Sequence, residues 1–190
     1  MKPREIKNRK VVSIVGMSGS GKSEVSQVFV ANGFSRIRFG DITDEEVRKK
    51  GLELNELNER SAREALRKEH GMATYARLNL PRIDSALGHI DVVIDGLYSW
   101  EEYVFLKEYY QGNFCVVAVS VSPIIRYSRL MNRAHRGLTE KEAASRDNAE
   151  IENLNKGGPI AMADFTIINE SSLAELKKNT EAVIAVIRGK

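Results

Sequence analysis

The segment "VVSIVGMSGSGKS", residues 11–23, constrains the fold of this chain more than any other. It starts with a short, mostly β-branched apolar run, which is typical of a strand buried on both faces. After the glycines, Val25, Val28 and Phe29 recur at helical spacing, and Gly33 follows as a C-terminal cap. A strand, a glycine-rich turn and a helix in this order predict a phosphate-binding unit within a parallel α/β sheet.

The spacing Gly16-x4-Gly21-Lys22-Ser23 is the pattern of a phosphate-binding loop, or Walker A motif. Glycines let the backbone approach phosphate oxygens closely, and successive N–H groups then form an anion site at the positive end of the helix. Lys22 can reach the β- and γ-phosphates, and the Ser23 hydroxyl can ligate Mg²⁺. We therefore expect ATP and Mg²⁺ as cofactors; the alternative is a Gly/Ser turn with an exposed lysine. The predicted nucleotide-binding residues of the loop are Gly16, Ser18, Gly19, Ser20, Gly21, Lys22 and Ser23.

The rest of the chain alternates strands with helices. "FSRIRF", "DVVIDG", "FCVVAVSV" and "DFTII" predict four more strands, and segments with helical periodicity lie between them. This order implies a five-stranded parallel sheet covered on both faces, a three-layer α/β/α sandwich. A chain of 190 residues suits a single domain. We assign its core to residues 10–40, 89–125 and 160–190.

Residues 41–88 form a predicted helical insertion between the second and third strands, because residues 43–88 carry helical pattern and no strand. We expect its last helix to be interrupted near Pro81. The insertion is a natural wall for a phosphoryl acceptor, in which Arg67 and Arg77 could hold an anionic group. The alternative is that it only covers the edge of the sheet.

Asp95 ends the predicted strand "DVVID". The carboxyl ends of parallel strands face the crevice where open α/β sheets bind ligands. We therefore predict that Asp95 and Ser23 hold Mg²⁺, directly or through water. The alternative is that Asp95 caps a helix or turn.

Residues 126–155, the predicted lid, are rich in arginine. The first three arginines are spaced i, i+3, i+7, which predicts one helix face, and guanidinium groups suit the charge of a transferring phosphoryl group. The alternative is a solvated basic face paired with nearby acidic residues. The five are Arg126, Arg129, Arg133, Arg136 and Arg146, and the acids are Glu140, Glu142 and Asp147.

Composition narrows the function classes. The 29 basic and 26 acidic side chains nearly balance, at a net charge of +3, which does not indicate nucleic acid as a partner. Cys115 is the only cysteine, so no internal disulfide or Cys-rich zinc site is expected.

No stretch approaches the ~18 apolar residues of a membrane helix, and the basic amino terminus lacks the apolar core of a signal peptide. We expect a cytoplasmic protein without membrane partners, a monomer or small homo-oligomer. "NKGG", residues 155–158, lacks the aspartate of a GTPase base-reading motif.

Several segments together resemble the P-loop nucleotide kinases. The similar segments are "IVGMSGSGKS", "FGDITDEEVRKKGLEL", "VVIDGLYSWEE", "RLMNRAHRGLTEKEAASRD" and "MADFTIINESSLAEL". Within these kinases the chain resembles both the dephospho-CoA kinases and the archaeal adenylate-kinase-related proteins. The resemblance covers nearly the whole chain.

This resemblance implies roles for individual residues. Asp41 would be an acid near the acceptor hydroxyl, as a general base or an orienting group. Arg133 and Arg136 would be lid arginines, and Arg146 a further phosphate contact. Asn169 would lie beside the adenine.

On the acceptor side, Arg67 stands where the archaeal group has an arginine that could bind the acceptor's phosphate. Tyr98, which we include among the acceptor-binding residues, stands where that group carries another arginine. A tyrosine cannot supply that charge, which disfavours AMP as the acceptor.

These inferences predict an ATP-dependent kinase acting on a small nucleoside-containing acceptor. The lid and C-terminal segments favour a dephospho-CoA-like molecule, and the segment after the second strand favours a nucleoside monophosphate. The alternative is a regulatory protein that binds or hydrolyses ATP without an acceptor.

Overall fold

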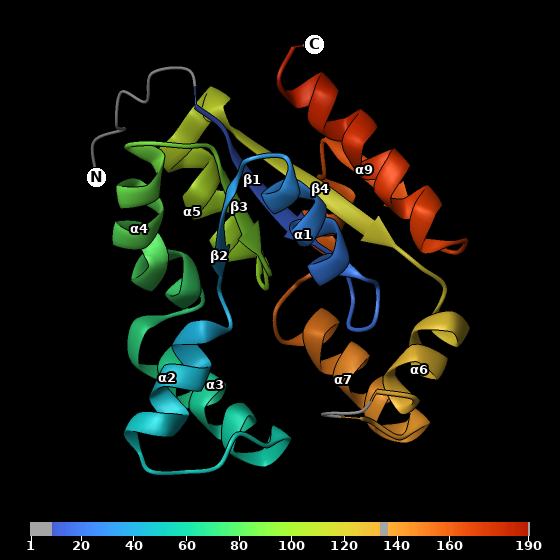
Figure 1. Ribbon diagram of the computed structural model, residues 1–190. Helices are drawn as coiled ribbons and strands as arrows, with labels where there is room; N and C mark the ends of the chain where they lie inside the picture. Colours follow the sequence, from blue (N-terminus) through green and yellow to red (C-terminus); the bar gives the residue numbers. More distant parts are fainter. Residues whose placement is uncertain (1–8, 134–136, 190) are drawn as a thin grey trace.

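One parallel sheet of five strands forms the centre of the molecule (Figure 1). The computed structural model describes residues 9–133 and 137–189. The strand order is β2-β3-β1-β4-β5, and all four pairings are parallel, as the sequence predicts. The strands are β1 Val11–Val15, β2 Ser35–Arg38, β3 Val92–Asp95, β4 Phe114–Ser120 and β5 Phe165–Ile168.

Helices cover both faces of this sheet, so the predicted three-layer arrangement is confirmed. α4 (Thr74–Leu87) and α5 (Trp100–Tyr110) pack on one face, and α1 (Lys22–Ala31) and α9 (Leu173–Ile187) pack on the other. The remaining helices are α2 Asp41–Lys49, α3 Glu56–His70, α6 Pro123–Met131, α7 Glu140–Glu152, the short α8 Gly157–Ala161 and a 3₁₀ turn at Gln111–Asn113. Within the described parts of the chain, no helix combines the length and the apolar character needed to cross a membrane.

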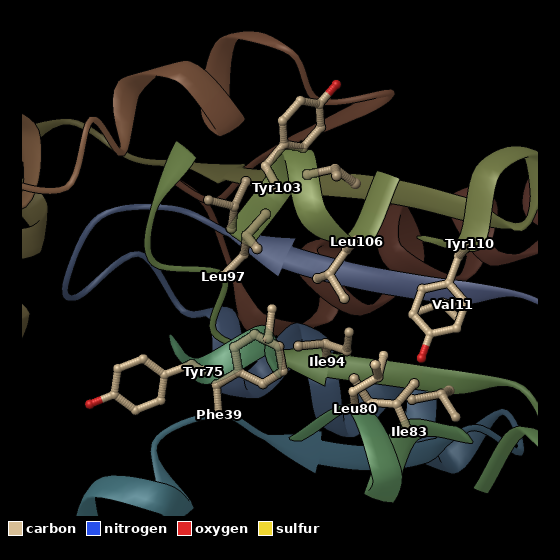
Figure 2. Packing of buried hydrophobic residues seen from close by; sticks show 14 of the residues in the cluster. Val11, Phe39, Tyr75, Leu80, Ile83, Ile94, Leu97, Tyr103, Leu106 and Tyr110 are labelled. Carbon is tan, nitrogen blue, oxygen red and sulfur yellow. The ribbon is translucent and has the colours of Figure 1, made fainter. Parts of the chain in front are cut away.

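The two faces have separate apolar cores, because successive side chains of a strand point to opposite sides. In β1, Val11 and Val15 join the cluster under α4 and α5, whereas Val12 and Ile14 join the cluster under α1 and α9. Figure 2 shows the first cluster, in which side chains of α4 and α5 meet the sheet. Both strand faces are apolar, which explains why the strands appear in the sequence as continuous rather than alternating apolar runs.

The helical insertion lies between β2 and β3 as predicted and consists of α2, α3 and α4. The predicted interruption at Pro81 is wrong, since α4 runs continuously through it. Proline removes one backbone donor, but Leu80, Ile83 and Leu87 on the same helix are buried against the core. This apolar packing outweighs the loss of a single hydrogen bond.

The helix pairs α2–α3 and α6–α7 lie on opposite sides of the region beyond the sheet, at lower left and lower right in Figure 1. The α6–α7 pair is joined by a buried ion pair, in which Arg126 of α6 donates to both carboxylate oxygens of Asp147, at 3.0 and 2.6 Å. Arg126 also donates to the carbonyl oxygen of Ser18, at 3.1 Å. The ion pair therefore connects these helices to the glycine loop.

The prediction that Arg126, Arg129 and Arg133 share one helix face is wrong, because α6 ends at Met131. Arg126 is paired with Asp147, one of the acids named in the alternative interpretation, but it is only 4% exposed and so does not belong to a solvated face. Arg129 donates to the backbone oxygen of Asn169, at 2.9 Å.

Replacing Arg126 by Met should lower the free energy of unfolding by about 3–5 kcal/mol, because it leaves the carboxylate of Asp147 buried without its cation. Chemical denaturation measures this. Arg126→Met combined with Asp147→Leu should recover much of the lost free energy of unfolding. Arg60→Met, which removes an exposed ion pair with Glu64, should have a free energy of unfolding close to that of the unaltered protein. An Arg126→Met variant as stable as the Arg60→Met variant would contradict the anchoring role.

Candidate functional site

The glycine loop, residues 16–21, joins β1 to α1 and has the backbone of a phosphate-binding loop. Gly19 and Gly21 adopt φ angles of 82° and 94°, a left-handed conformation that side chains disfavour. A Cβ at Gly19 would also lie 2.8 Å from the carbonyl oxygen of Arg126. α1 begins immediately after the loop at Lys22, so the first N–H groups of the helix face the same space.

Asn169 stabilises the loop through a hydrogen bond to its backbone. Its side-chain amide donates to the carbonyl oxygen of Ser20, at 2.8 Å, and the side chain is buried at the end of β5. Ser20 is itself fully buried. Asn169 therefore holds the shape of the loop, and its predicted place beside an adenine stays a prediction.

Lys22 folds back over the loop and donates to the carbonyl oxygens of Gly16 and Met17, each at 2.9 Å. Burial, followed by the nearby charge of Lys156, lowers the pKa of Lys22 from 10.5 to about 7. Anionic phosphate groups would oppose both effects and favour the charged ammonium.

Ser23 and Asp95 lie together, as predicted from the sequence. The Ser23 hydroxyl donates to the Asp95 carboxylate at 3.4 Å, so one cation could contact both oxygens directly or through water. Oxygen donors of this kind fit Mg²⁺. Asp95 also forms an ion pair with Arg36 of β2, which was not singled out in the sequence and which neutralises part of the charge of this carboxylate.

A cavity of about 160 Å³ opens beside these groups, and its walls come from distant parts of the chain. Five basic side chains line it against two acidic ones, so it favours a ligand with several negative charges. The lining residues are Ser18, Gly19, Lys22, Ser23, Arg38, Asp95, Gly96, Tyr98, Arg133, Arg146, Glu150 and Lys156.

Arg38 and Tyr98 form the wall on the side of the helical insertion. Arg38 Nη1 donates to Asp41 at 2.7 Å and to Asp44 at 2.9 Å. Burial alone would lower the pKa of Arg38, but these hydrogen bonds raise it. Burial raises the pKa of Tyr98, so its hydroxyl is neutral. Asp41 thus contacts a cavity residue but does not line the cavity itself.

The structure does not bring the two predicted arginines of the insertion into the cavity. The guanidinium of Arg67 lies 5.2 Å from the centre of the Tyr75 ring, inside the insertion. Arg77 is exposed, and its guanidinium lies 5.1 Å from the centre of the Phe105 ring on α5. The prediction that Arg77 lies inside the wall is therefore wrong, because its position on α4 faces α5.

The α6–α7 region contributes Arg133 and Arg146, two of the predicted arginines. Arg136 lies outside the described residues. Sequence reasoning missed Glu150 and Lys156, which line the same cavity. The spacing of Arg146 and Glu150, one helical turn apart on α7, is a signal that could have indicated Glu150. Lys156 has no comparable local signal.

A model of the AAA domain family matches residues 12–155. Across 92% of this chain and 98% of the relative, the sequence is 36% identical to UPF0200 protein TK1334 from Thermococcus kodakarensis. The chain belongs to the UPF0200 family. Another UPF0200 protein, from Hyperthermus butylicus, is 32% identical over 96% of this chain and 97% of its own length.

Solved structures share the fold of this UPF0200 chain. TT1252 from Thermus thermophilus is 20% identical, with a TM-score of 0.64 over 95% of this chain and 98% of its own. A gluconokinase from Sinorhizobium meliloti is 18% identical, with a TM-score of 0.63 over 98% and 96%. A shikimate kinase from Bacteroides thetaiotaomicron is 13% identical, with a TM-score of 0.60 over 94% and 98%. The fold is thus that of P-loop kinases, as expected, and the P-loop indicates nucleotide binding.

Binding of ATP at about pH 8 should take up protons from solution. Lys22, whose pKa is about 7, is then mostly neutral, and the phosphates raise that pKa and protonate it. ATP itself is fully ionised at that pH, so the pH dependence of its affinity comes from Lys22. The affinity for ATP should fall as the pH rises above about 7, because Lys22 loses its proton. Calorimetry in two buffers of different ionisation enthalpy measures the uptake. Lys107→Met, a lysine outside the cavity, should leave it unchanged, and an uptake near zero in the unaltered protein would contradict this account of Lys22.

Proposed function

We propose that this UPF0200 protein is an ATP-dependent phosphotransferase that moves the γ-phosphoryl group of ATP to a small nucleoside-containing acceptor. The observation that supports this most directly is the cavity itself. It joins the phosphate loop, the adjacent oxygens of Ser23 and Asp95, and basic side chains from both the insertion side and the α6–α7 region. Positioning and charge stabilisation supply most of the catalysis of phosphoryl transfer, and these groups suit both.

Each group has a role in this proposal. Lys22 and the loop N–H groups bind the phosphates, and Arg133 and Arg146 stabilise the charge on the transferring group. Ser23 and Asp95 would hold Mg²⁺, which supplies charge neutralisation at the phosphate oxygens when bound. The acceptor oxygen forms the new bond to the γ-phosphorus as the bond to the bridging oxygen of ADP breaks. ADP is the leaving group, and where the acceptor is a hydroxyl its proton is released to solvent.

The acceptor would lie between this cavity and the insertion, beside Arg38 and Tyr98. Resemblance to the dephospho-CoA kinases supports a hydroxyl acceptor on a nucleoside-containing molecule, and resemblance to the archaeal group supports a nucleoside monophosphate. Because proteins of the same fold include a gluconokinase and a shikimate kinase, gluconate and shikimate serve as comparison acceptors.

The first test is transfer from ATP to a panel of dephospho-CoA, nucleoside monophosphates, gluconate and shikimate. One nucleoside-containing acceptor should yield product, and chelation of Mg²⁺ by EDTA should abolish the reaction until Mg²⁺ is restored.

Lys22→Ala should lower turnover by about 10²–10³-fold while leaving the fold intact, since one charge contact of the transition state is lost. Lys107→Ala is the matched control.

Product only from gluconate or shikimate would overturn the nucleoside assignment. Hydrolysis of ATP with no product from any acceptor would instead support the regulatory ATPase. Near-native turnover by Lys22→Ala would remove the phosphate-loop role.

A second test addresses Asp41. Because Asp41 contacts Arg38 and does not line the cavity, we propose that it positions Arg38 for the acceptor. Asp41→Asn should raise the acceptor KM several-fold with a smaller change in kcat, since Asp44 still holds Arg38. A loss of about 10²–10⁴ in kcat with an unchanged KM would show instead that Asp41 is a general base for a hydroxyl acceptor.

A further inference from the structure

Lys156 is a buried lysine in the wall of the phosphate cavity. It precedes α8, and its side chain is 1% exposed. Asn155, with a left-handed φ of 50°, turns the chain after α7, and the Lys156 N–H donates to the backbone oxygen of Glu150. The ammonium lies 5.6 Å from the centre of the Tyr98 ring. Burial of an ammonium is unfavourable by several kcal/mol unless it is paired, so Lys156 is expected to have an anionic partner.

The partner of Lys156 is Glu150 of α7, which also contacts the phosphate loop. One carboxylate oxygen of Glu150 accepts from Lys156 at 2.7 Å. The other accepts from the Ser18 hydroxyl at 3.1 Å and from Arg146 Nε at 3.3 Å. A single carboxylate thus joins the loop, the lid arginine and the buried lysine.

Glu150 is ionised at neutral pH. Burial opposes ionisation, but the positive charges of Lys156, Lys22 and Arg146 outweigh it and lower the pKa of Glu150 to about 2. These cations line the cavity beside the phosphate loop. A phosphoryl group placed among them would meet the same donors and would be repelled by the carboxylate at short range.

We propose that Lys156 is a phosphate ligand of the nucleotide site, and that Glu150 is the internal counter-ion that a phosphoryl group of ATP replaces. The proposal rests on the proposed ATP site and deepens it. Glu150 keeps the ammonium of Lys156 paired through one carboxylate oxygen, while its other oxygen accepts from Ser18. On ATP binding the ammonium exchanges its carboxylate partner for phosphate oxygens.

A purely structural ion pair makes different predictions. It would affect unfolding, but removal of either partner would leave the affinity for nucleotide unchanged. The exchange model requires opposite effects on affinity, because one partner attracts the phosphates and the other repels them.

The experiment measures affinity for a slowly hydrolysed ATP analogue by calorimetry, with thermal unfolding of every variant. Lys156→Met should weaken binding about 10-fold or more, since a charge-assisted hydrogen bond is lost. Glu150→Gln should tighten binding several-fold. Lys107→Met is the matched control, because Lys107 also lies near a tyrosine ring, at 5.1 Å, but outside the cavity. Glu64→Gln removes the carboxylate of an exposed ion pair and should have no effect.

The double variant Lys156→Met/Glu150→Gln keeps the test decisive if Lys156→Met unfolds, because it leaves no carboxylate unpaired. It should bind the analogue about 10-fold more weakly than Glu150→Gln alone. Equal affinities of these two variants would overturn the role of Lys156, and unchanged or weaker binding by Glu150→Gln would overturn the exchange. If Lys22→Met also binds like the unaltered protein, the proposed ATP site fails as well; if only Lys22→Met loses binding, the ATP site stands without Lys156.

Discussion

Concentrated positive charge around the phosphate loop is the constraint on which the rest of the site depends. Five basic side chains share one cavity, and their mutual repulsion must be balanced by fixed negative groups. Asp95 and Glu150 provide this balance inside the cavity, and the acids that hold Arg38 provide it from outside. The result is a site whose cations are held in place and still carry an excess of charge for an anionic ligand.

The loop beside this charge is not stabilised by its own sequence alone. Asn169 at the end of β5 and Arg126 of α6 both donate to its carbonyl oxygens, so segments about 110–150 residues away in the chain determine its shape. The same arginine joins α6 to α7 through Asp147. Arg126 therefore links the α6–α7 region directly to the phosphate loop.

Glu150 and Lys156 extend this connection. Glu150 of α7 contacts Ser18 of the loop and Lys156 of the segment that follows α7. In the exchange that we propose, nucleotide binding changes the partners of these groups, so the ligand acts on the α6–α7 region through electrostatics at short range. Lys156 belongs to the "NKGG" segment, which lacks the aspartate of a guanine-reading motif. In our proposal this segment contributes a phosphate ligand instead.

Much of the fold could be predicted because its signals are local. Buried parallel strands need continuous apolar runs, and a phosphate loop needs glycines at a fixed spacing, so all five strands, the loop and the pairing of Ser23 with Asp95 follow from short stretches. The course of α4 through Pro81 could not be predicted, since packing against the sheet outweighs the local effect of proline.

The arginines show the limit of sequence patterns most clearly. Arg126, Arg133 and Arg146 look alike in the sequence, but one is an anchor bound to Asp147 and two line the cavity. The sequence by itself determined the α/β architecture and the presence of a phosphate-binding loop, because both depend on residue type and spacing. Only the tertiary structure decided which charges meet, including Lys156 with Glu150, because the energy of a charge depends on its burial and on partners brought together by the fold.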